Sequence, residues 1–114
     1  MYKPYGVIPP IITPFDSDGK INYESLAQMS VYLVENGVHG LFPFGTTGEF
    51  YAVNDEEFVK SLETVRDAVA GKKNCYGKPI QLFAGCSHIT TRGVIHLIHL
   101  VEQVGGYDAV SVLT

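Results

Sequence analysis

The stretch GLFPFGTTGEF, residues 40–50, joins a short apolar run to a loop in which two adjacent threonines are framed by glycines. Apolar residues without polar alternation, as in residues 40–44, are typical of a strand covered on both faces, and such strands occur in parallel sheets. The loop, residues 45–49, follows this strand directly and precedes a helical pattern. Backbone N–H groups and hydroxyls in that position can bind a small anion. We therefore predict an α/β fold with an anion-binding loop.

Three further apolar runs, rich in β-branched residues, are similar to residues 40–44. Their starts are spaced by roughly 30 to 40 residues, about the size of one βαβ unit. None alternates cleanly between apolar and polar residues, which again favours a parallel sheet. The predicted strands are Val7–Phe15, Gly40–Phe44, Ile80–Gly85 and Asp108–Leu113.

A helical pattern fills each interval between these strands. Asn54 and Glu57 have the spacing of a capping box, which marks the start of the second helix. Gly105 and Gly106 stop the third helix, because glycine readily adopts the conformation that ends a helix. The predicted helices are residues 23–36, with Asn22 as N-cap and Gly37 after the end, residues 55–70, with Gly71 after the end, and a third from Thr90 or Thr91 to residue 104.

The resulting order, strand-helix-strand-helix-strand-helix-strand, fits two architectures. Every connection is long enough for a right-handed crossover, so an open doubly wound sheet and a barrel both remain. The 114 residues suffice for one modest domain, whereas a complete (β/α)₈ barrel needs about 250. No Gly-x-Gly-x-x-Gly follows the first predicted strand, which argues against a doubly wound nucleotide-binding protein.

The composition excludes several classes of protein. With 46% hydrophobic residues, 18% charged residues and a net charge of −4, the chain is typical of a soluble globular protein without a basic surface for nucleic acid. No apolar run is long enough to span a membrane, and the first residues lack the features of a secretory signal. Two cysteines, Cys75 and Cys86, make no disulfide framework, so we expect a cytoplasmic protein.

The threonine loop is the strongest candidate site on residue chemistry alone. Ligands in α/β folds bind at the carboxyl ends of parallel strands. Gly45 and Gly48 let a ligand approach the main chain, while Thr46 and Thr47 each offer a hydroxyl and an N–H. A carboxylate held by several such donors needs no arginine. A plain glycine turn, with threonines that cap a helix, explains the same residues, and composition alone leaves both interpretations open.

Other reactive side chains are weaker candidates. His96 and His99 share a helical pattern and have His88 nearby, but no third ligand in a coherent geometry is evident, so ordinary surface histidines are the preferred interpretation. Cys86 has no convincing base beside it and is predicted to be a small buried hydrophobic residue rather than a nucleophile. We therefore expect neither a metal nor a cofactor.

Residues 40–50, together with Glu57, resemble the signature of the dihydrodipicolinate synthase and N-acetylneuraminate lyase family, the pyruvate-dependent class I aldolases. Three further stretches agree with this family in order and spacing: ITPF at residues 12–15, FAGC at residues 83–86 and DAVSVLT at residues 108–114. The resemblance spans nearly the whole chain.

This resemblance implies that residues 1–114 are the N-terminal half of a (β/α)₈ TIM-barrel domain, truncated after the fourth strand. It also implies a homo-oligomeric lyase that acts on pyruvate, or a related 2-keto acid, through a lysine Schiff base. Thr47 would then hold the keto-acid carboxylate through its hydroxyl and N–H, and Thr46 would relay protons to tyrosines supplied elsewhere. The implied substrate-binding residues are Gly45, Thr46, Thr47 and Gly48, with Glu49 as a structural support whose carboxylate accepts hydrogen bonds from loop and helix N–H groups.

The family's Schiff-base lysine and catalytic tyrosines belong to segments after Thr114. A Schiff-base lysine must be partly desolvated so that its amine is neutral, and no lysine here lies in an apolar strand. We therefore expect residues 1–114 alone to be inactive. The six lysines are Lys3, Lys20, Lys60, Lys72, Lys73 and Lys78.

The resemblance implies that the second substrate is recognised mostly by loops that follow Thr114 in the chain. The two loop threonines favour a dihydrodipicolinate synthase (4-hydroxy-tetrahydrodipicolinate synthase), whereas Gly85-Cys86 and residues 108–111 look more like N-acetylneuraminate lyases and keto-deoxy sugar acid aldolases. An alternative of another class is a non-catalytic half-barrel that binds an anion or assembles with another chain, because a half-barrel has two open sheet edges.

Overall fold

The computed structural model describes residues 1–113; Thr114, the last residue of the fourth stretch that resembles the aldolase family, lies outside them. Three strands form one sheet in the order β1-β2-β3, and the helices alternate with them along the chain. The strands are β1 Gly40–Leu41, β2 Gln81–Gly85 and β3 Ala109–Ser111; the helices are α1 Tyr23–Glu35, α2 Asp55–Ala68 and α3 Thr91–Val104, with a short 3₁₀ helix, η1, at Phe50–Ala52.

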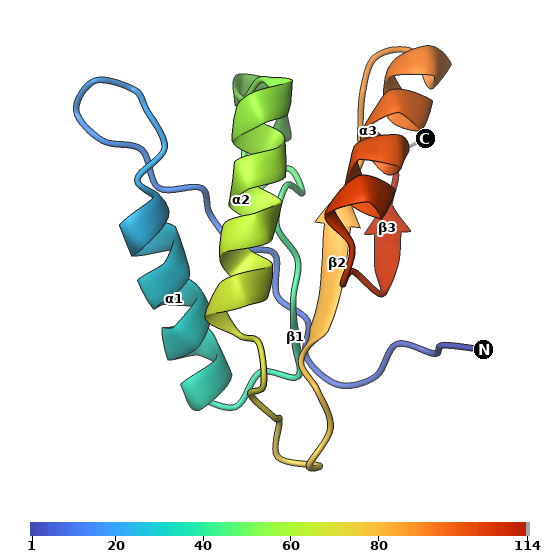
Figure 1. The fold of residues 1–114 in the computed structure, drawn as a ribbon. Coiled ribbons are helices and arrows are strands. Elements are labelled where there is room, and N and C mark those ends of the chain that lie inside the picture. The colour runs from blue at the N-terminus through green and yellow to red at the C-terminus, as the bar shows by residue number, and fades with distance from the viewer. Residues whose placement is uncertain (114) are drawn as a thin grey trace.

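The winding of the chain distinguishes the two predicted architectures. Strands that follow one another in the chain are neighbours in the sheet, and each pair is parallel. The helices stand side by side in one layer in front of the strands (Figure 1), with α1 against α2 and α2 against α3. A doubly wound sheet carries helices on both faces and reverses its strand order. Over residues 1–113 the winding therefore favours the barrel, of which the chain forms a part.

The first predicted strand, Val7–Phe15, is wrong as a regular strand, although its segment pairs with Phe42 just after β1. The Ile11 N–H donates to the Phe42 carbonyl at 3.0 Å, and the Phe42 N–H donates to the Pro9 carbonyl at 3.1 Å. Pro10 pairs with Phe42 through a single parallel bridge. Because Pro9 and Pro10 have no N–H, a continuous ladder of hydrogen bonds cannot form here.

The local helix signals in the sequence are confirmed. In the capping box, the Glu57 N–H donates to Asn54 Oδ1 and the Asn54 N–H donates to Glu57 Oε1, each at 2.9 Å. The α3 helix begins after Thr90 and ends before Gly105, as predicted. The α2 helix ends somewhat earlier than its predicted stop at Gly71. No helix within residues 1–113 is both long and apolar enough to cross a bilayer.

Two apolar clusters fill the space between the sheet and the helices. One of them lies near the carboxyl ends of β1 and β2 and includes Phe44, whose ring packs on Phe58 with the centroids 5.1 Å apart. Cys86 belongs to the same cluster and is fully buried, which confirms its predicted place in the core. Burial raises the pKa of this thiol to about 11. The carboxyl end of the sheet therefore packs against a buried apolar cluster.

Candidate functional site

The threonine loop, residues 45–49, begins where β1 ends and rests on the carboxyl end of β2. β1 ends at Leu41, earlier than the predicted Phe44, and Phe44 has φ 62°, in the left-handed region, which turns the chain away from the sheet. The Gly85 N–H donates to the Pro43 carbonyl at 2.9 Å. A Cβ on Gly85 would lie 1.9 Å from the Phe44 carbonyl oxygen, so only glycine lets the chain sit this close to β2. The loop thus occupies the edge where barrels bind ligands.

Two consecutive turns and one buried hydroxyl hold the threonine loop. The Gly48 N–H donates to the Gly45 carbonyl, and the Glu49 N–H donates to the Thr46 carbonyl, each at 3.0 Å. The buried Thr13 hydroxyl donates to the Gly48 carbonyl at 2.6 Å. Sequence reasoning assigns Thr13 only to the first strand and misses this role, because it lies 35 positions from its partner and no local pattern links the two.

Thr46 and Thr47 are the exposed residues of this loop. Within residues 1–113, neither the N–H nor the hydroxyl of either threonine donates to another protein group, so four donors remain available. Gly45 is half-buried beside them. Gly48 is buried, and a Cβ there would lie 2.9 Å from the Ile11 carbonyl oxygen. Gly48 therefore allows close packing, and its contact with a substrate stays a prediction.

Glu49 lies at the start of the 3₁₀ helix, and its structural support of the loop stays a prediction. It has φ 57° and precedes η1 as the N-cap residue, but its side chain makes no capping hydrogen bond. In the described part of the chain, the carboxylate therefore does not fix the start of the 3₁₀ helix as expected. The buried anchor of the loop is instead the Thr13 hydroxyl.

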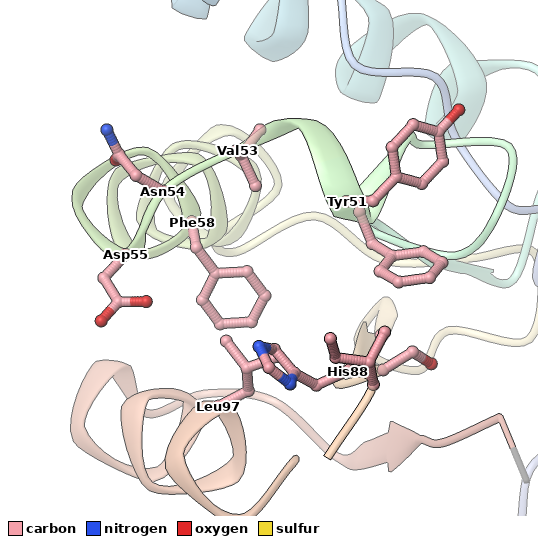
Figure 2. Close-up of a pocket in the computed structure, with 11 residues that line it drawn as sticks. Tyr51, Val53, Asn54, Asp55, Phe58, His88 and Leu97 are labelled. Atoms are coloured by element: carbon pink, nitrogen blue, oxygen red, sulfur yellow. The ribbon is translucent and has the colours of Figure 1, made fainter. Parts of the chain in front are cut away.

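A separate hollow of about 290 Å³ lies next to the threonine loop, between the start of α2 and α3. Figure 2 shows Phe58 on α2 above Leu97 on α3, with the His88 ring beside them. Most of its lining is apolar, and neither Thr46 nor Thr47 contributes to it. The hollow and the threonine donors are thus two distinct features of the same end of the sheet.

The histidines near this hollow have protein partners of their own. His96 Nε2 lies 2.6 Å from Asp55 Oδ2, so this pair joins α3 to the start of α2. His88 Nδ1 accepts from the Thr90 N–H at 3.1 Å. Among the residues up to 113, no three His, Cys, Asp or Glu side chains lie close enough to hold a metal ion. The observed contacts of His88 and His96 are thus hydrogen bonds within the protein structure.

Comparison with known proteins identifies the family. The model of the family described as "Dihydrodipicolinate synthetase family" matches residues 3–114. The chain belongs to this family. A 4-hydroxy-tetrahydrodipicolinate synthase of Methanocaldococcus jannaschii is 38% identical over 114 residues, which are 100% of this chain and 36% of that protein. The chain thus spans about a third of the length of such relatives.

Solved structures of dihydrodipicolinate synthetase family members and related lyases share the fold. An N-acetylneuraminate lyase from Proteus mirabilis has a TM-score of 0.83 at 27% identity, over 97% of this chain and 35% of that one. The Escherichia coli K12 prophage protein YagE, of the dihydrodipicolinic acid synthase family and solved in complex with pyruvate, has a TM-score of 0.80 at 29% identity, over 94% and 33%. The family and the barrel predictions are therefore confirmed.

Proposed function

We propose that the protein containing these residues is a carbon–carbon lyase that acts on pyruvate through a lysine Schiff base, in the manner of a 4-hydroxy-tetrahydrodipicolinate synthase. The observation that carries the proposal is the set of free N–H and hydroxyl donors on Thr46 and Thr47 at the carboxyl edge of the sheet. Membership of the dihydrodipicolinate synthetase family supports the reaction class. The pyruvate complex of the related YagE supports a 2-keto acid as the substrate.

The threonine loop would serve this reaction as a carboxylate clamp. The N–H and hydroxyl of Thr47 donate to the substrate carboxylate, and the Thr46 hydroxyl relays a proton between the substrate and tyrosines of the remaining barrel. Hydrogen bonds to a charged acceptor are stronger than those between neutral groups. They contribute most where the donors are fixed before the ligand arrives, and the Thr13 anchor of the loop supplies that rigidity.

The covalent step would need a lysine from outside residues 1–113. In that step the amine condenses with the pyruvate ketone, water leaves, and the imine withdraws electrons from the methyl group; the resulting enamine attacks an aldehyde, or the reverse cleavage releases pyruvate. Five of the lysines here are exposed, and the sixth, Lys72, is only half-buried in a surface loop. None lies in a buried apolar strand, the surroundings that a Schiff-base lysine requires. These residues alone are therefore proposed to be inactive.

The second substrate divides the proposal into two branches. A 4-hydroxy-tetrahydrodipicolinate synthase is favoured by the two loop threonines and by relatives of that name. An N-acetylneuraminate lyase or a keto-deoxy sugar acid aldolase is the alternative, supported by the structural likeness to the Proteus mirabilis lyase. Assays with aspartate semialdehyde and with sugar aldehydes, each in the presence of pyruvate, separate the two branches.

Borohydride trapping tests the proposed chemistry. The intact protein, treated with pyruvate and then borohydride, is expected to gain a stable pyruvate-derived mass on a lysine beyond Thr114. Residues 1–114 expressed alone are expected to gain none. An adduct on any of the six lysines of this chain would overturn the assignment of the nucleophile. Carboxylate binding without any adduct in the intact protein would instead support the non-catalytic anion-binding alternative.

Substitution of the loop threonines tests the assigned roles. Thr47→Val should raise the KM for pyruvate about tenfold, because one hydrogen bond to a charged group is lost, and Thr47→Ser should restore it. Thr46→Val should lower kcat more than it changes KM. Thr64→Val is the matched control, because its hydroxyl donates to the Lys60 carbonyl within α2, away from the loop. A normal KM for Thr47→Val would contradict the clamp.

A further inference from the structure

The loop between α2 and β2 places an exposed thiol against a histidine at the end of the sheet opposite the threonine loop. Cys75 Sγ lies 3.4 Å from His39 Nε2. Cys75 is exposed, and His39, just before β1, is half-buried. The two residues are 36 positions apart, so the contact is a product of the fold. This Cys75–His39 pair is remote from the loop of residues 45–49 and independent of the proposed function.

The main chain fixes which nitrogen of His39 faces the sulfur. The Val7 N–H donates to His39 Nδ1 at 2.9 Å, so Nδ1 is an acceptor. A neutral imidazole has one acceptor and one donor, and the proton must then sit on Nε2, which faces Cys75. The ring is also held by stacking on Tyr76, with the centroids 5.1 Å apart and the planes at 23°. A fixed N–H donor is thus directed at the thiol.

The loop that carries Cys75 is rigidly built. Asn74 is buried, and its Oδ1 accepts from the Tyr76 N–H at 2.9 Å and from the Lys78 N–H at 3.3 Å. Its Nδ2 donates to the Tyr5 hydroxyl at 2.9 Å, which ties the loop to the N-terminal segment. The sulfur therefore keeps its place beside His39 although the side chain is open to solvent.

The surroundings of the pair are positively charged. Residues 71–80 contain three lysines and no acidic residue. The Lys78 Nζ lies 5.1 Å from the centroid of the Tyr5 ring, and that ring lies edge-on to His39 at 6.2 Å. A local excess of positive charge raises the concentration of small anions near the surface. The positive charge around Cys75 therefore favours anionic reagents over neutral ones.

We propose that Cys75 and His39 form a thiol-modification site that takes a small anionic disulfide. The Cys75 thiol loses its proton to solvent, and the thiolate attacks one sulfur of the disulfide. A new S–S bond forms to Cys75, the S–S bond of the reagent breaks, and its electron pair leaves on the second sulfur as a thiolate. Cys75 is oxidised and half of the reagent is reduced. The His39 Nε2–H stabilises the negative sulfur that attacks.

Cys86 is the internal control for the reactivity of Cys75. It is fully buried in the core near the carboxyl end of β2, and burial raises the pKa of its thiol to about 11. A disulfide reagent cannot reach it in the folded protein, and it carries little thiolate at neutral pH. Of these two cysteines, only Cys75 should therefore react with a disulfide reagent in the native protein, whereas both should react after unfolding.

Reaction with Ellman's reagent, an anionic aromatic disulfide, tests the proposal. Cys75→Ser should release one rapid equivalent fewer than the wild-type protein. His39→Ala should slow this phase about fivefold, because a hydrogen bond to a partly exposed charged group is lost. His88→Ala is the matched control, because this exposed histidine hydrogen-bonds Thr90 rather than Cys75, and it should leave the rate unchanged. An unchanged number of rapid equivalents in Cys75→Ser, or a wild-type rate in His39→Ala, would overturn the pair.

Two further measurements keep the test decisive if His39→Ala loosens the fold. Release of one equivalent more than the wild-type protein would reveal exposure of Cys86, and His39→Gln, which keeps an N–H donor, should then react within about twofold of wild type. The neutral disulfide dithiodipyridine tests the charge without any substitution. Added salt should slow the anionic reagent and spare the neutral one. Equal salt dependence of the two rates would refute the preference for anions.

Discussion

The anchor of the threonine loop gives the sharpest prediction of stability. Thr13→Val keeps the shape of the side chain but removes the hydroxyl that donates to the Gly48 carbonyl at 2.6 Å. Both Thr13 and Gly48 are buried, so water cannot replace the lost donor. The net loss of one hydrogen bond, together with a buried carbonyl left unpaired, should cost about 1–2 kcal/mol of unfolding free energy.

Urea unfolding followed by circular dichroism measures this loss. With a typical dependence of stability on urea, the midpoint should fall by about 0.5–1 M. Thr13→Ser should restore most of it. Thr64→Val is the matched control, because its hydroxyl bonds the Lys60 carbonyl at the helix surface, and it should change stability by less than about 0.5 kcal/mol. Equal shifts for Thr13→Val and Thr64→Val would refute the reasoning that burial makes this hydroxyl important.

Three further predictions follow from the strand ends and the helix caps. Gly85→Ala should destabilise the protein by about 3 kcal/mol or more in the same urea assay, because its Cβ would lie 1.9 Å from the Phe44 carbonyl oxygen; a wild-type midpoint would contradict the close approach. Asn54→Ala should cost about 1 kcal/mol and lower the thermal midpoint, because the capping box with Glu57 is lost; an unchanged midpoint would argue against the cap. Cys86 stays protonated in the folded protein to a pKa of about 11 but ionises at its ordinary pKa when unfolded, so stability should fall by about 2–3 kcal/mol between pH 9 and pH 11. The fall should be smaller by that amount in Cys86→Ala, and parallel pH profiles for the two proteins would contradict the burial argument.

Where the sequence predicted local structure correctly, the deciding physics lies within a few residues. The Asn54 and Glu57 side chains satisfy each other's backbone N–H groups within a single turn, so their spacing alone indicates the start of α2. The first strand failed for an equally local reason. Its apolar pattern predicted a strand of a parallel sheet, but Pro9 and Pro10 cannot donate to a neighbouring strand.

The sequence by itself determined the alternation of strands and helices, the place of the threonine loop at a strand end, and the family resemblance carried by residues 40–50. Only the tertiary structure decided the one-sided layer of helices, the Thr13 anchor of that loop and the Cys75–His39 contact. Each of these joins groups that are distant along the chain. Such contacts form only after the helices and strands have packed, because no local propensity encodes which remote carbonyl or sulfur a side chain will meet.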